Sequence, residues 1–208
     1  APHPRLRDQT TQPGTLIFKL GGYDPAKLDA EEIQRRYVKA LADGELEEGD
    51  YAHAQSRFLS FLAGGGDNAQ HVFGADSSTA ATQTQANIAG RRSLLRLIRF
   101  VRTLPGCERA QVQRMMQETA VRETYRIVGQ TLITCDDYTS GRRFDDAVCY
   151  SFYPVDLHDR HGVKPQPLRP GTVPTVPFGA LVPQDSRNLL VAGRCVSSDR
   201  LANSALRV

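Results

Sequence analysis

The feature that most constrains the fold is a set of prolines between residues 144 and 180, at positions 154, 165, 167, 170, 174 and 177. Each proline removes a backbone hydrogen-bond donor and restricts φ, so no long helix can run through this stretch. We therefore expect short strands and ordered loops there. Because other parts of the chain carry helical patterns, the whole fold is expected to be mixed α+β.

Helical patterns lie mainly in the first half of the chain. The longest covers residues 79–104, and Pro105 and Gly106 end it. Its apolar side chains recur at helical intervals; they are Leu94, Leu97, Ile98, Val101 and Leu104. A second helix is expected over residues 29–42, with Asp29 as N-cap and Glu32 in the capping-box position. A third is expected over residues 109–120, whereas residues 56–62 fit either a helix or a strand.

Strand-like segments separate these helices. Residues 15–20 and 130–134 are apolar or β-branched, and Asp136 and Asp137 fit the start of a short helix. Residues 188–193 form a continuous apolar run that ends in Gly193. Such a run is typical of a fully buried strand in a parallel sheet.

Composition excludes several classes of protein. The chain has 208 residues, with 26 Lys+Arg and 23 Asp+Glu, and a net charge of +3 is too small to indicate nucleic-acid binding. The arginines between Arg91 and Arg102 are interpreted as the solvated face of a helix. No apolar run is long enough for a membrane helix, and residues 1–5 do not resemble a secretory signal, so a cytoplasmic protein without a membrane partner is expected.

The four cysteines have no CxxC spacing, which argues against a structural zinc site, and we expect them to be reduced thiols. No metal site is predicted.

Two groups of residues are candidates for chemistry. Asp156 and His158 are two positions apart and share one side of an extended segment, where a carboxylate can orient an imidazole as a general base. A structural role and metal ligation remain open alternatives. Arg122, Arg126 and Arg143 stand beside carboxylates and either form internal ion pairs or bind a substrate carboxylate. The chain has no GxGxxG, P-loop, HExxH or GxSxG motif.

An ordered set of segments resembles the FAD-dependent oxidoreductases of the glutathione-reductase-like superfamily. The segments are QPGTLIFKLGG (12–22), ANIAGRR (86–92), PG (105–106), VRETYRIVGQTLITCDD (121–137), SGRRFDDAVCYSFYPVDLHD (140–159), NLLVAGRCVSS (188–198) and SALRV (204–208). The resemblance implies hydride transfer between a small organic substrate and FAD.

The resemblance also implies roles for particular residues. His158 would handle the proton and Asp156 would orient it, while Tyr153 and the three arginines named above would contact or support the substrate. Flavin contacts are implied for two segments, which contain Gly193, Arg194, Cys195, Leu206 and Arg207. Tyr125 stands where many relatives have a third arginine, which implies altered substrate specificity.

On this resemblance the chain is expected to be a fragment. Residues 1–14 would lead in from the flavin domain, residues 15–178 would form a substrate domain, and residues 179–208 would supply the last strand and turn of the flavin domain. An N-terminal dinucleotide-binding unit and a C-terminal flavin-facing helix would be missing, so the chain alone would bind FAD poorly. The alternative is a non-catalytic binding or assembly module, or one subunit of a split flavoenzyme completed by a second chain.

Overall fold

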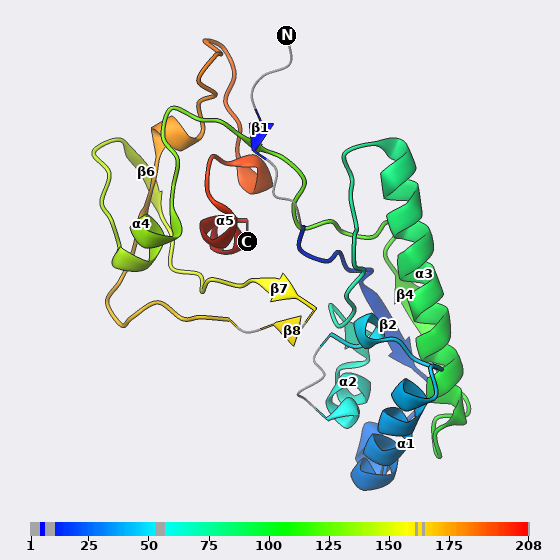
Figure 1. Ribbon diagram of the computed structural model, residues 1–208. Helices are drawn as coiled ribbons and strands as arrows, with labels where there is room; N and C mark the ends of the chain where they lie inside the picture. The colour runs from blue at the N-terminus through cyan, green and yellow to red at the C-terminus, as the bar shows by residue number, and fades with distance from the viewer. Residues whose placement is uncertain (1–4, 7–10, 53–56, 161, 164, 208) are drawn as a thin grey trace. The chain divides into compact units, whose positions relative to one another are not determined.

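The computed structural model describes residues 5–6, 11–52, 57–160, 162–163 and 165–207. The chain forms two compact units (Figure 1). Unit 1 comprises Ala1–Thr11, Arg122–His158 and Val163–Val208, and unit 2 comprises Gln12–Val121 and Asp159–Gly162. The mixed α+β fold expected from the sequence is confirmed, because both units combine helices with small antiparallel sheets.

Unit 2 contains a three-stranded antiparallel sheet in the order β3-β2-β4. The strands are β2 (Phe18–Gly21), β3 (Gly66–Asp67) and β4 (Gln111–Met115). The helices of unit 2 are α1 (Ala30–Ala42), α2 (Phe58–Gly64) and α3 (Ala80–Thr103), the last being the long green helix of Figure 1. Side chains from β2 and all three helices share one buried core.

Aromatic rings fill much of that core. Tyr37 of α1 stacks on Phe58 of α2 with ring centroids 4.6 Å apart, and Phe100 of α3 meets Phe58 edge-on at 5.5 Å. Such offset and edge-on pairs contribute about 0.5–1.5 kcal/mol beyond their burial. The rings therefore fix the packing of the three helices.

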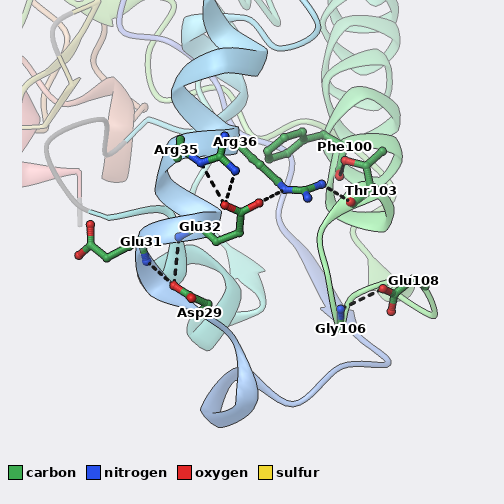
Figure 2. A network of polar contacts seen from close by, with 9 residues as sticks. All are labelled: Asp29, Glu31, Glu32, Arg35, Arg36, Phe100, Thr103, Gly106 and Glu108. Carbon is green, nitrogen blue, oxygen red and sulfur yellow. Dashed lines mark hydrogen bonds and ion pairs between the residues drawn. The ribbon is translucent and has the colours of Figure 1, made fainter.

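Polar contacts at the start of α1 add to this packing (Figure 2). The Asp29 carboxylate accepts hydrogen bonds from the Glu31 and Glu32 amides, as expected for an N-cap. The Glu32 side chain turns instead to Arg35 and Arg36, and Arg36 donates to the Thr103 carbonyl at 3.1 Å. The last contact ties α1 to the end of α3.

Unit 1 is built from short elements. Strand β1 (Arg5–Leu6) pairs with β5 (Arg126–Ile127), β6 (Ala147–Tyr150) pairs with β9 (Thr175–Pro177), and β7 (His158–Asp159), which ends in unit 2, pairs with β8 (Gly162–Val163). Its helices are α4 (Cys135–Ser140) and α5 (Arg200–Leu206). A second core, which includes Ile133, Tyr138 and Ala202, joins them.

Several predicted elements are confirmed. The helices expected over 29–42 and 79–104 are α1 and α3, and among its described residues the proline-containing stretch holds short strands, loops and one 3-10 turn, Phe178–Ala180. The ambiguous segment at 56–62 is helical from Phe58, and Asp136 and Asp137 lie in the first turn of α4. The first strand is displaced from the expected 15–20 to Phe18–Gly21.

The helix predicted over residues 109–120 is wrong, because Gln111–Met115 form strand β4. Their partner is β2, which is far away in sequence and offers an open edge. Gly22 permits the close approach: it has φ +90°, and a Cβ there would lie 2.3 Å from the Arg109 carbonyl oxygen. Pairing with β2 therefore overrides the local helical pattern.

The strands predicted at 130–134 and 188–193 are also wrong. Ile133 makes only an isolated bridge with Ser198. Residues 188–193 are not a strand, and Leu189 and Leu190 are 45% and 60% exposed. A buried parallel strand needs a neighbour on each side, and no described strand pairs with this segment.

Candidate functional site

The central pair of the candidate site is Asp156 and His158, at the end of unit 1's middle segment. His158 Nε2 lies 3.1 Å from Asp156 Oδ2, and the two residues are 6% and 8% exposed. The spacing of two residues along extended backbone brings the side chains to one side, as predicted from the sequence. The pair is therefore a buried imidazole held against a carboxylate.

Residues of helix α5 and its C-cap contact both the backbone and the carboxylate of Asp156. The Ser204 hydroxyl accepts a hydrogen bond from the Asp156 amide at 3.1 Å, and Arg207 donates to the Asp156 carbonyl at 2.9 Å. The same guanidinium lies 3.5 Å from Asp156 Oδ2. Asp199 caps this helix by accepting from the Ala202 amide, which sets Ser204 and Arg207 on one face of the helix.

Burial and nearby charges together shift the pKa values of Asp156 and His158. Burial lowers the pKa of His158, and the nearby charges of Arg122 and Arg207 lower it further, while Asp156 opposes them. The hydrogen bond from His158 lowers the pKa of Asp156 despite burial, with help from both arginines. Burial, assisted by the charge of Arg207, lowers the pKa of Arg122 to about 10. At neutral pH the site thus holds a carboxylate, a neutral imidazole and two guanidinium ions.

A second set of charges lies beside this one. Glu123, 3% exposed, accepts from Arg200 at 3.2 Å and lies 3.9 Å from Arg126. Arg126 also donates to the Ser198 carbonyl at 2.8 Å. Arg126 thus forms internal contacts, which was one of the two roles left open for it. It ties β5 to the segment that leads into α5.

The structure brings only some of the predicted substrate residues together. Arg122 is close enough to Asp156 and His158 to shift their pKa values. Burial lowers the pKa of Arg207, and Tyr153 is among the groups that oppose this shift. Arg143 is exposed, and its guanidinium lies 4.9 Å from the ring centroid of Tyr150.

Of the residues predicted to contact flavin, some are exposed and others lie beside Asp156 or the second core. Gly193, Arg194 and Cys195 form an exposed 3-10 turn, in which Gly193 has φ +77° and open space where a Cβ would be. Leu206 is partly buried against the second core. Arg207 donates a hydrogen bond to the Asp156 carbonyl. Burial is the main cause that lowers the pKa of Arg207, and the charge of Arg194 lowers it further.

Two supporting residues were missed by the sequence analysis, Asn203 and Ser204. Both are buried, and Asn203 Nδ2 donates to the Arg194 carbonyl at 3.2 Å. Glu123 is the carboxylate already noted beside Arg122 and Arg126, and it forms the internal ion pairs that were one of the two expected roles. The only local signal was the capped helix that places Ser204 and Arg207 three residues apart. Their partner Asp156 is 48 residues away from Ser204 in sequence.

Other features of the described residues are simple to state. None of the helices found there is long and apolar enough to cross a membrane. No group of three or more His, Cys, Asp or Glu side chains in these parts of the chain is placed to hold a metal ion. All four cysteines are free thiols.

Comparison with known protein families identifies this chain as similar to one of them. The model of a family described as FAD dependent oxidoreductase matches residues 5–208. No curated protein and no solved structure matches the chain significantly.

Proposed function

Since the chain belongs to the FAD dependent oxidoreductase family, we propose that unit 1 supplies the proton-handling side of a flavin-dependent hydride transfer. The substrate would be a small organic molecule that loses or gains a proton together with the hydride. His158 is the proton-handling group and Asp156 orients it. We also propose that residues 15–178 serve as the substrate domain of the complete, cytoplasmic enzyme.

The observation that carries this proposal is the buried contact between His158 Nε2 and Asp156 Oδ2 at 3.1 Å. When Nε2 donates to the carboxylate, the lone pair of the neutral ring is on Nδ1. Because burial and the two arginines lower the pKa of His158, the ring is neutral at physiological pH and able to accept a proton. This is the state required of a general base.

The arginines have a second role in this proposal. A substrate oxygen gains negative charge as His158 takes its proton, and a fixed guanidinium stabilises such charge in a buried site. Arg122 is the best placed of the predicted substrate residues, because its charge is felt by both His158 and Asp156. Tyr153 would border the substrate. Arg126 would support the site, and Arg143 is the weakest candidate because it lies over Tyr150.

The residues present fit part of a flavin site. In the turn Gly193–Cys195, the space beside the Gly193 backbone is open because glycine has no side chain. The exposed guanidinium of Arg194 can offset the negative charge of a bound cofactor. These residues would hold the cofactor, whereas Leu206 would only support α5. FAD, when bound in the complete protein, supplies the hydride chemistry.

The test is His158→Gln in the complete flavoprotein. Rapid anaerobic mixing with substrate should show flavin reduction slowed by roughly 10²–10⁴-fold, the usual contribution of a general base. Flavin content should be unchanged. In the unmodified enzyme the rate should fall on acidification with a limiting pKa below that of a free histidine, and the variant should lose this dependence.

Asp156→Asn should also slow reduction, because the neutral amide holds the imidazole less firmly. Its matched control is Asp145→Asn, since Asp145 is an exposed carboxylate of the same unit. Flavin reduction at the normal rate in His158→Gln would rule out the assignment.

A further inference from the structure

Unit 2 contains a cavity that the proposed reaction does not use. Its volume is about 290 Å³, and its walls come from the 3-10 turn Glu48–Asp50, from residues 71–73 and from one face of α3. On α3 the lining residues are Ala89, Arg92, Ser93 and Arg96, which are spaced at three and four residues and so share one face. Gly49 permits the turn to come this close, because a Cβ there would lie 2.3 Å from the His71 carbonyl oxygen.

A buried hydroxyl forms part of the wall. Ser93 is 4% exposed, and its oxygen accepts a hydrogen bond from Gln70 Nε2 at 2.8 Å. Gln70 is held in turn by the Leu16 amide and the Gly90 carbonyl. A serine hydroxyl that accepts one hydrogen bond keeps its own hydrogen to donate, so Ser93 can donate to a group bound in the cavity.

Two arginines of α3 differ sharply in their surroundings. Arg96 donates to both carboxylate oxygens of Asp50, at 2.8 and 2.7 Å, and to Glu47 at 2.9 Å. Arg92, one turn earlier, lines the cavity but is exposed to solvent, and within the described parts of the chain its side chain makes no hydrogen bond or ion pair. The two carboxylates already offset the charge of Arg96, so Arg92 is the guanidinium of the cavity wall that can bind an added anion.

A second hollow shares an aromatic ring with this cavity. Phe73 is 37% exposed and lines both the cavity and a hollow of about 590 Å³, whose walls combine the apolar Leu41 and Leu46 with the charged Glu47, Glu48 and Arg160. Arg160 covers Phe73, with its guanidinium 5.3 Å from the ring centroid. The cavity thus combines the polar groups of Arg92 and Ser93 with the apolar ring of Phe73.

We propose that this cavity binds a small organic monocarboxylate. Arg92 and Ser93 donate to the carboxylate, and an apolar tail lies against Phe73 toward Leu46. A guanidinium fork and a hydroxyl match the geometry of a carboxylate. A phosphate dianion fits less well because Glu47 and Asp50 border the same space. This binding site is independent of the reaction assigned to unit 1.

The experiment is a titration of the full ¹⁵N-labelled chain with hexanoate, followed by amide chemical shifts. Saturable shifts should appear at residues 71–73 and 89–96. Hexanamide, which lacks the charge, and acetate, which lacks the tail, should each bind roughly tenfold or more weakly than hexanoate. Inorganic phosphate should also bind more weakly than hexanoate.

Arg92→Gln should weaken hexanoate binding roughly tenfold, and Ser93→Ala should weaken it several-fold. The matched control is Arg99→Gln, since Arg99 is an exposed arginine of α3 that does not line the cavity. The proposal is overturned if hexanoate fails to saturate these residues, if hexanamide binds equally well, or if Arg99→Gln has the same effect as Arg92→Gln. Tighter, Arg92-dependent binding of phosphate would replace the carboxylate with a phosphate ligand.

Discussion

Gly90→Ala in the middle of α3 sets two known effects against each other. Alanine is favoured over glycine in a helix by about 1 kcal/mol, so helix propensity alone predicts a more stable protein. The surroundings predict the opposite. A Cβ at Gly90 would lie 2.5 Å from Thr119 Oγ1 and 3.1 Å from Leu16 Cβ. Real Cβ atoms do not approach so closely, so a neighbour would have to move.

Neither neighbour can move cheaply. Leu16 is fully buried, and Thr119 is 2% exposed. The Thr119 hydroxyl donates to the Ala86 carbonyl at 3.0 Å, and its amide donates to Asn87 Oδ1 at 2.7 Å. Overpacking costs about 1–3 kcal/mol, and displacing a buried hydroxyl from its acceptor costs about 1–3 kcal/mol more. After subtraction of the propensity gain, Gly90→Ala should lower the free energy of unfolding by about 1–5 kcal/mol.

Urea unfolding followed by far-UV circular dichroism measures this change. A double-mutant cycle makes the test sharper, because Thr119→Ala removes the hydroxyl that the new Cβ would meet at 2.5 Å. In that background only the approach to Leu16 Cβ at 3.1 Å remains, so Gly90→Ala should destabilise the chain less than it does in the unmodified protein. The reasoning is refuted if Gly90→Ala stabilises the unmodified chain, or if it has the same effect in both backgrounds.

Three further substitutions test buried polar groups. Because burial lowers the pKa of His158, the unfolded chain takes up the proton first, so stability should fall as pH drops below about 6.5. His158→Gln should remove that part of the fall in urea unfolding measured across this pH range. Tyr138→Phe should lower the free energy of unfolding by about 1–2 kcal/mol, since the Tyr138 hydroxyl contacts Ser151 Oγ and the Tyr153 carbonyl, both at 2.8 Å. An unchanged urea midpoint would contradict this. Asp50→Asn should cost about 2–3 kcal/mol in the same assay, less than a fully buried pair, because its partner Arg96 is 28% exposed. A loss under about 0.5 kcal/mol would show that the pair contributes little.

Elements set by local rules could be predicted from the sequence. Helices α1 and α3 follow from apolar periodicity, and Asp29 and Pro105 mark a start and an end that need no distant partner. The contact between Asp156 and His158 is equally local, because alternate residues of an extended segment point the same way.

Features that depend on distant partners could not be predicted. Strand β4 forms because β2 offers an edge to pair with. The segment at 188–193 was predicted to be a strand from its apolar composition alone, but it is exposed and is not a strand. The support of Asp156 by Arg207 joins residues 51 apart in sequence, and no spacing rule reaches that far. The cavity of unit 2 combines three separated segments, although the face of α3 that lines it has a regular spacing that could have been noticed.

The division of the chain also bears on the order in which the protein folds during synthesis. Nearly all of unit 2 is one continuous stretch, Gln12–Val121, whereas unit 1 needs three stretches that include the last residues of the chain. Domains tend to fold as their residues emerge, and closing a long loop delays the contacts at its ends. Unit 2 should therefore fold first on the ribosome. Glu123 meets Arg200 only after 77 further residues have been made, so this ion pair cannot form until then.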